Sequence, residues 1–424
     1  MSTSGINLCV KAIQELWARK SVNISINLVG EQGNTIKTYT NSDQINGTAA
    51  ITVEHDVDFD HLNITFEGKQ CLSGVQRANR PSAHRSTNRC FRTFLKMRYP
   101  LSTNIFPSPR QFKKDETYSF PFSFVVPDCI EPPVCTSKLD EAHTQLPLTL
   151  TGGSRDGFTP SICEVIYAIQ VRIVNGPRRQ VLAAQSKQVR VVPTNDQTHS
   201  GLGGKADVEG HQIDPHILEQ VIGRSTLTAS QPPPIRLLTP EYVVSKDICS
   251  IAVRVRFDSV DRVPPPRLKT LRTKLEVSTT YTCNPGLQVG CASTAGTDRF
   301  VRSIPLSSVC MRSVQWQWAR RSQKDNLAND DSQHLGCAGD CYEASVVVPI
   351  TLPRDKVLVP SFASCLMSRD YILKLSVSHS TSSVSPLHTT VQIDIPLKII
   401  SMVDSIETPR KWRSDERNNN EGTS

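Results

Sequence analysis

Apolar and polar residues alternate over TYSFPFSFVVP, residues 117–127, where Tyr118, Phe120, Phe122 and Phe124 occupy every second position and Val126 continues the series. A period of two is typical of a β-strand with one buried face. Two other interpretations compete, a membrane span and an aromatic stripe that binds a ligand. A spanning helix needs roughly 20 apolar residues, and this short run has acidic neighbours. The pattern therefore predicts a strand whose aromatic face is core.

The same alternation recurs in six further segments, which predicts an all-β chain of many half-buried strands. Pro121 lacks a backbone N–H, so its strand is expected at a sheet edge or at a bulge. Only two short helices are expected, over Lys11–Arg19 and Pro215–Ile222. The alternating apolar positions are Ile24, Ile26 and Leu28; Leu62, Ile64 and Phe66; Val165, Tyr167, Ile169, Val171 and Ile173; Ile251, Val253, Val255 and Phe257; Tyr371, Leu373, Leu375 and Val377; and Val391, Ile393, Ile395, Leu397 and Ile399.

The sequence also repeats itself loosely. Each half has a Tyr-led turn, then a strand ending in proline (FSFVVP and VVVPITLP), then a strand containing tyrosine (EVIYAIQVRIV and RDYILKLSV). This order predicts two tandem immunoglobulin-like β-sandwich domains. The expected boundaries are an N-terminal extension at 1–20, a first sandwich at 21–194, a Gly- and Pro-rich linker at 195–231, a second sandwich at 232–403 and a disordered tail at 404–424.

Net charge and cysteine content indicate the class of partner and the cellular compartment. The 424 residues carry a formal charge of +8 with a pI of about 8.8, which favours an acidic partner without naming one. The chain has 13 cysteines, and its first residues lack the apolar core of a secretory signal. No other segment is long and apolar enough to span a membrane. We therefore expect reduced thiols in the cytosol.

Several motifs in one order resemble a known family. Residues 23–68 hold an alternating strand, a Tyr-led turn, an I-x-G strand and an I-x-F-x-G strand. They are followed by F-P-F-x-F-x-x-P at 120–127, EVIYAIQVRIV, and LVPSFASCLMSRDYILKLSVS in the second half. Together these resemble fungal arrestin-related proteins, over residues 21–403. The resemblance implies the arrestin-like fold, with N-terminal and C-terminal arrestin-like domains.

The family resemblance implies a function as well. It predicts a cytoplasmic adaptor, peripheral at the plasma membrane or endosomes. Such a protein binds cytosolic regions of membrane transporters or receptors and promotes their ubiquitin-linked endocytosis, protein transport or signal transduction. The family usually binds its ubiquitin ligase through Pro-Pro-x-Tyr. The proline runs here, PPPIRLL and PPPRLK, lack that tyrosine, so ligase recruitment by this route is not implied.

Residues with recognisable chemistry are few. The sequence contains no Gly-x-Ser-x-Gly, His-Glu-x-x-His or phosphate-loop motif, so we expect neither an enzyme nor a cofactor. His334, Cys337 and Cys341 fall within HLGCAGDC, with Cys283 and Cys291 upstream. Thiolate and imidazole suit zinc, but the usual two-residue spacing is missing. Loop thiols without a metal are the favoured interpretation.

The strongest charge signal is a basic segment with no acidic residue between Gly68 and Lys114. Arginine binds phosphate and carboxylate through a bidentate fork. The segment is therefore a candidate docking site for acidic or phosphorylated tails or for anionic lipid, and its alternative is a solvated insert between two strands. No nucleic-acid motif accompanies it, so nucleic acid is not expected. Its basic residues are Arg77, Arg80, Arg85, Arg89, Arg92, Lys96 and Arg98.

Three functions remain open at this point. The first is the trafficking adaptor. The second is a scaffold of the same fold that assembles a signalling or vesicle-coat complex without ubiquitin. The third is a sugar-binding or hydrolytic β-sandwich, which the missing signal peptide and paired carboxylates disfavour.

Overall fold

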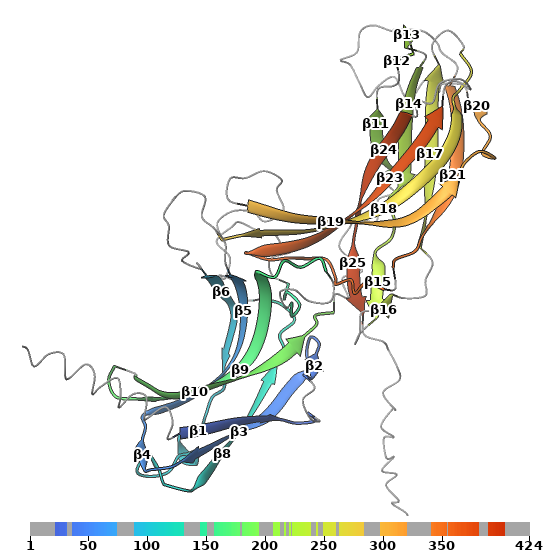
Figure 1. The fold of residues 1–424 in the computed structure, drawn as a ribbon. Helices are drawn as coiled ribbons and strands as arrows, with labels where there is room; N and C mark the ends of the chain where they lie inside the picture. Colours follow the sequence, from blue (N-terminus) through green and yellow to red (C-terminus); the bar gives the residue numbers. More distant parts are fainter. Residues whose placement is uncertain are drawn as a thin grey trace, which may run out of the picture.

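The computed structural model is an all-β protein, with strands throughout and a single 3-10 turn at Thr103–Ile105 among its described residues (Figure 1). It describes residues 22–31, 36–73, 89–130, 145–150, 157–178, 180–194, 207–212, 216–217, 220–221, 223–238, 243–244, 249–259, 263–283, 297–319, 341–353, 355–380 and 389–402. The expected helix at Lys11–Arg19 and the expected tail at 404–424 lie outside these ranges.

Within the described ranges, ten strands belong to the N-terminal half and fifteen to the C-terminal half. The first ten are β1 Val22–Leu28, β2 Thr38–Tyr39, β3 Gln44–Val53, β4 Val57–Asp58, β5 His61–Ser73, β6 Arg89–Arg98, β7 Gln111–Phe112, β8 Thr117–Val125, β9 Cys163–Asn175 and β10 Gln180–Val191. The others are β11 Asp207–Gln212, β12 His216–Ile217, β13 Gln220–Val221, β14 Gly223–Ser230, β15 Ile235–Leu238, β16 Val243–Val244, β17 Cys249–Ser259, β18 Arg267–Thr282, β19 Thr297–Cys310, β20 Gln317–Ala319, β21 Cys341–Ile350, β22 Phe362–Ala363, β23 Met367–Ser380, β24 Thr389–Leu397 and β25 Ile399–Met402.

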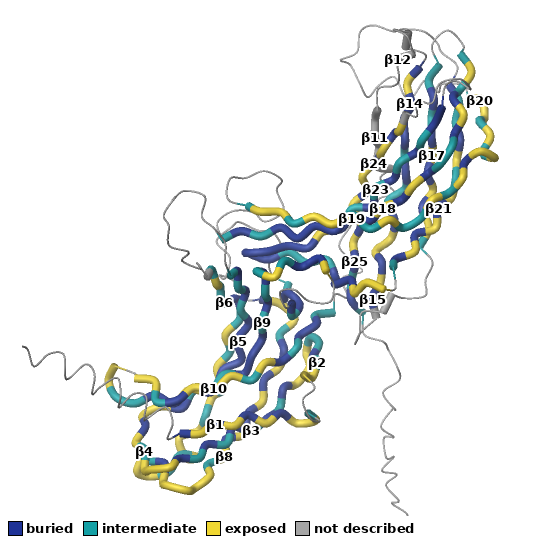
Figure 2. Tube along the Cα trace, viewed as in Figure 1, coloured by how far each residue is buried: buried dark blue, intermediate teal, exposed yellow. Residues whose placement is uncertain are grey.

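Two sheets of the N-terminal half pack together in a sandwich-like arrangement. Their strand orders are β1-β3-β8 and β2-β10-β9-β5-β6. The rings of Phe66 on β5 and Phe124 on β8 have centroids 6.0 Å apart, so the aromatic side chains of the two sheets meet in the interior. Phe120, Phe122 and Phe124 are all buried, and Figure 2 shows buried stretches along the strands of both halves. The aromatic face of residues 117–127 is core, and β8 lies at the edge of its sheet, as Pro121 predicts.

The C-terminal half repeats the strand pairing of the N-terminal half. Its main sheets have the orders β11-β14-β17-β21-β20 and β19-β18-β23-β22. β24 also pairs with β23, along the edge of β23 opposite β18. Within these sheets β14, β17 and β21 neighbour one another as β1, β3 and β8 do, and β24-β23-β18-β19 matches β10-β9-β5-β6. Each set of seven strands also follows the same order along the chain.

Two smaller features repeat as well. A short strand between the first two long strands pairs in parallel near the end of each half, β2 with β10 and β15 with β25. Tyr167 on β9 donates its hydroxyl hydrogen to the Pro147 carbonyl, and Tyr371 on β23 does so to Val359, each at 2.5 Å. The halves therefore share one topology down to a matching tyrosine contact, although their sequences match only loosely.

Two expectations about residues 195–231 are wrong. A helix is expected over Pro215–Ile222, but β12 and β13 pair there in antiparallel fashion. Ile217 and Val221 are β-branched, and β-branched residues favour strands. The segment is also not free of strands, since β11 pairs with β14 and β14 with β17. β11 has the sequence DVEGHQ, which lacks apolar alternation. The sequence pattern therefore does not predict this strand.

Candidate functional site

The basic segment is partly a strand. Arg77, Arg80 and Arg85 lie outside the described residues, and Arg89 opens β6 with only its backbone described. Arg92, Lys96 and Arg98 follow on the same strand, which is the last strand of its sheet. The interpretation as a solvated insert therefore fails for residues 89–98, because β6 pairs with β5 along its length. Basic side chains on an edge strand also hinder edge-to-edge association with another sheet.

A β-bulge divides these basic side chains between two faces. Gly68 on β5 pairs with Leu95 and Lys69 pairs with Thr93, so Phe94 is the extra residue. A Cβ atom at Gly68 would lie 2.6 Å from the Phe94 ring, and glycine is therefore what allows this ring to enter the core. Sequence patterning does not reveal the bulge, because Gly68 stands inside an otherwise regular strand.

The bulge sets the partner of each basic residue. Arg92 pairs in register with Gln70, whereas Lys96 pairs with Glu67 and Arg98 with Thr65. Residues 65 and 67 share one face of β5 and residue 70 lies on the other, because successive side chains alternate across a strand. Arg92 is thus separated from Lys96 and Arg98, and the basic segment is not one continuous patch.

Glu67 forms a buried ionic cluster beneath the basic edge. Its carboxylate lies 2.7 Å from Lys69 Nζ and 3.7 Å from Lys96 Nζ, with the carboxylate side almost fully covered. The Thr65 hydroxyl donates to the same carboxylate at 3.1 Å. Burial raises the pKa of Glu67, but the hydrogen bond and charge of Lys69, the Thr65 hydroxyl and the charge of Lys96 outweigh it and leave the pKa below its ordinary value. The carboxylate is therefore held ionised.

Cations exceed anions on this face. Glu67 neutralises one of the two lysines, while exposed Arg98 beside Thr65 has its guanidinium available at the edge. An exposed lysine and an exposed arginine two residues apart suit an anionic group on an extended partner, since arginine offers a planar fork to carboxylate or phosphate. The structure thus keeps Lys96 and Arg98 of the expected site together and places Arg92 elsewhere.

Arg92 lies beside a residue that contacts the other half. On its pairing partner Gln70, the side-chain oxygen accepts a hydrogen bond from the Leu366 backbone N–H at 3.3 Å. Thr279 on β18 donates to the Phe158 carbonyl at 2.9 Å. These contacts join segments far apart in the chain, so polar groups as well as apolar ones hold the halves together.

Arg369 is the most deeply buried charged residue of the junction. Its Nη2 atom donates to the Thr159 hydroxyl at 2.8 Å, and neither residue is solvent-exposed. No motif in the sequence identifies it, since SRDYILKL reads as an ordinary strand with a charged beginning. A buried guanidinium is costly unless it is hydrogen-bonded, so its position depends on both halves being in place.

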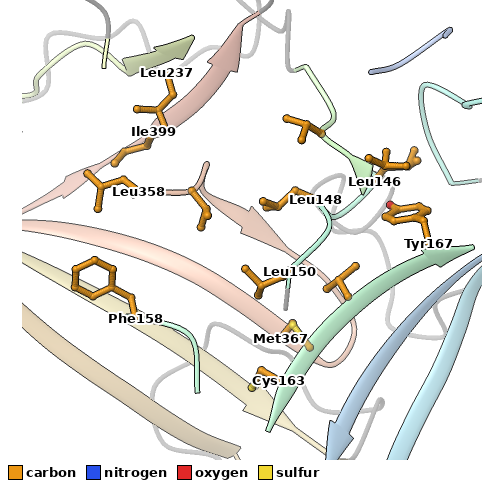
Figure 3. Close-up of a cluster of buried hydrophobic side chains, with 14 of the residues drawn as sticks. Leu146, Leu148, Leu150, Phe158, Cys163, Tyr167, Leu237, Leu358, Met367 and Ile399 are labelled. Carbon is orange, nitrogen blue, oxygen red and sulfur yellow. The ribbon is translucent and has the colours of Figure 1, made fainter. Parts of the chain in front are cut away.

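Buried apolar side chains from both halves form a cluster at the junction (Figure 3). Leu150, Phe158 and Cys163 come from the N-terminal half, and Leu358 and Met367 from the C-terminal half; all are buried. Burial raises the pKa of the Cys163 thiol to about 12, although the nearby Arg369 guanidinium opposes the shift. The Cys163 thiol is therefore protonated near neutral pH and behaves as an apolar core group.

The remaining candidate sites are smaller. His334 and Cys337 lie outside the described residues, whereas Cys341 is buried on β21 and donates its thiol hydrogen to the Ala319 carbonyl at 2.9 Å. In the ranges that the structure describes, no three metal-ligating side chains come together. A cleft between β1 and β10 has no ionisable side chain among its lining residues Val22, Asn23, Ile24, Val181, Leu182, Ala183, Ala184 and Gln185.

No model of a known protein family matches this chain, and no curated protein matches it. The resemblance to arrestin-related proteins therefore stays a prediction from the sequence. Across the described ranges, no helix has the length and hydropathy needed to cross a bilayer.

Proposed function

We propose that the chain is a non-enzymatic, arrestin-like adaptor built from two tandem immunoglobulin-like β-sandwich domains. The observation that carries the proposal is the repeat of seven strands with the same order and the same pairings in both halves. The segments that resemble the family fall on β1 to β5, β8 and β9 in the first half and on β22 and β23 in the second, and β9 and β23 are equivalent strands of the repeat. A tandem duplication with a packed junction suits a binding scaffold rather than a catalytic cavity.

The proposed partners are acidic or phosphorylated cytosolic regions of membrane transporters or receptors. Lys96 and Arg98 on edge strand β6 support this choice, because they offer two cations on a strand that has, among the described residues, a neighbouring strand on one side only, which leaves its other side to an extended peptide. The adaptor would act in the cytoplasm, at the plasma membrane or endosomes, and promote ubiquitin-linked endocytosis of the bound cargo. Anionic lipid is the second proposed ligand of the same cations.

The direct test compares cells with and without the protein. Surface transporters would be biotinylated, followed over time, and probed for attached ubiquitin. The proposal predicts that a defined set of transporters leaves the surface more slowly and carries less ubiquitin when the protein is absent. Equal internalisation and equal ubiquitination of all labelled transporters would contradict it.

One observation favours a second candidate, a scaffold of a signalling or vesicle-coat complex that recruits no ubiquitin ligase. The 424 residues contain no Pro-Pro-x-Tyr. For this scaffold, the same experiment would give slower sorting of cargo with unchanged ubiquitin. The two measurements, surface residence and ubiquitin content, therefore distinguish the two candidates.

A further inference from the structure

Two cysteines from opposite halves meet at the junction. Cys90 lies on β6 and Cys283 directly follows β18. The Sγ atom of Cys90 donates to the Cys283 backbone carbonyl oxygen at 3.5 Å, although the two residues are 193 positions apart. Both side chains are partly exposed. We propose that Cys90 and Cys283 are a disulfide-forming pair that covalently joins the two halves under oxidising conditions.

The contact places the backbone of Cys283 close to the Cys90 thiol. From the 3.5 Å contact and standard C=O and Cα–C lengths, the Cα atom of Cys283 lies within about 6 Å of the Cys90 sulfur. A disulfide requires two Cα atoms about 4.4–6.8 Å apart. Bond formation therefore requires both side chains to rotate and the two strand ends to approach to that separation.

Other pairings of Cys90 with its neighbours are excluded by the sheet. Cys90 and Cys163 both pair with Leu72, from opposite sides, so two strand spacings, about 9–10 Å, separate them. That exceeds the disulfide range. Cys71 precedes Leu72 on β5 and faces the other side of the sheet. Cys163 is also fully buried, which keeps oxidants and other thiols away from it.

The chemistry requires a two-electron oxidant, for which a peroxide suffices. The thiolate of one cysteine attacks a peroxide oxygen, which breaks the O–O bond and gives a sulfenic acid and one water. The second thiolate attacks the sulfenic sulfur, forms the S–S bond and releases a second water after protonation. Hydrogen peroxide is thereby reduced to two water molecules and two thiols are oxidised to one disulfide. A thiol reductant reverses the bond by exchange.

The test maps the bond in the wild-type chain. Purified full-length protein would be treated with hydrogen peroxide, alkylated and digested with trypsin without reductant. The expected product joins peptide 90–92, CFR, to peptide 275–299, and fragmentation must place the bond at Cys283 rather than at Cys291. Separately, a protease cut at any bond between residues 90 and 283 should give fragments that separate on a denaturing gel only after reduction.

Matched variants complete the test. Cys90→Ser and Cys283→Ser should each abolish the linked peptide, whereas Cys163→Ser and Cys291→Ser should retain it. A bond that maps to Cys163 or Cys291, or that appears only between two chains, would overturn the proposal, as would the absence of any link after peroxide treatment. Because the wild-type digest is decisive by itself, a variant that folds poorly does not obscure the answer.

Discussion

Arg369 of β23 donates a hydrogen bond to the Thr159 hydroxyl of the N-terminal half across 2.8 Å, and the guanidinium is fully buried. One contact thus makes the position of a charged group in the second half depend on a hydroxyl in the first. Hydrogen bonds to charged groups contribute about 1.5–3 kcal/mol each. The stabilities of the two halves are therefore expected to be coupled.

Thr159→Val keeps the shape of the side chain and removes the acceptor of Arg369 Nη2. We expect the free energy of unfolding to fall by about 1.5–3 kcal/mol, because a buried charged donor loses an acceptor. Urea denaturation followed by fluorescence measures it. Thr103→Val, at an exposed threonine, should change stability by less than about 0.5 kcal/mol. Equal effects of the two substitutions would show that the junction contact contributes little.

Two phenylalanines on edge strands test the core. Phe122 on β8 is 3% exposed and Phe91 on β6 is 70% exposed. Phe122→Ala should therefore lower the free energy of unfolding by about 3–5 kcal/mol, whereas Phe91→Ala should change it by no more than about 0.5 kcal/mol. Thermal or chemical denaturation of both variants provides the comparison. A reversed order of the two effects is incompatible with the packing described.

The ionic cluster of Glu67 predicts a pH dependence. The pKa of Glu67 in the folded chain lies below its ordinary value, so the unfolded chain binds a proton more readily. The stabilisation is present above an unfolded pKa of about 4.3 and is lost as the pH falls through the lower folded pKa. Denaturation should show stability decreasing with acidification below about pH 4.3. Glu67→Gln should flatten that part of the profile, and an unchanged slope would exclude Glu67 as its source.

The basic edge of β6 predicts salt-sensitive binding. Changing Lys96 and Arg98 together to Ala should weaken binding of a phosphorylated acidic peptide while leaving the fold intact, because both side chains are exposed and Lys69 still pairs with the buried Glu67 carboxylate at 2.7 Å. Wild-type binding should decline with added salt, since the Debye length shortens from about 10 Å at 0.1 M to about 3 Å at 1 M. Fluorescence anisotropy measures both effects.

A matched pair of cations on another sheet serves as the control for that experiment. Arg224 and Arg254 are exposed on β14 and β17, and their replacement by Ala should leave peptide affinity unchanged. Arg98→Lys should retain attraction to anionic vesicles better than binding to a phosphopeptide, because lysine keeps the charge but lacks the bidentate fork. Wild-type affinity of the Lys96 and Arg98 double variant would remove β6 as the binding strand.

Sequence patterning predicted the strands well wherever apolar residues alternate, as at Phe120, Phe122 and Phe124, because one buried face determines both the pattern and the fold. It missed β11 and the β12–β13 hairpin. These strands are short and polar, and they form because they pair with neighbouring strands rather than because one face is apolar. It also treated the basic segment as one unit, whereas the bulge opposite Gly68 separates Arg92 from Lys96. Burial of Arg369 depends on contacts between residues about 210 positions apart, which no local pattern encodes.

The parallel pairing of β25 with β15 has a consequence for synthesis of the protein on the ribosome. Ile235 pairs in register with Ile399, and the Ser401 hydroxyl donates to the Pro193 carbonyl of the other half. The strands of the first half can associate once Val191 has emerged, but β15 must wait until more than 160 further residues have been made. During that interval Ile235 and Leu237, which are buried in the finished protein, lack the cover of β25 and present an apolar surface to solvent. Translation that stops before Ile399 leaves that surface exposed permanently.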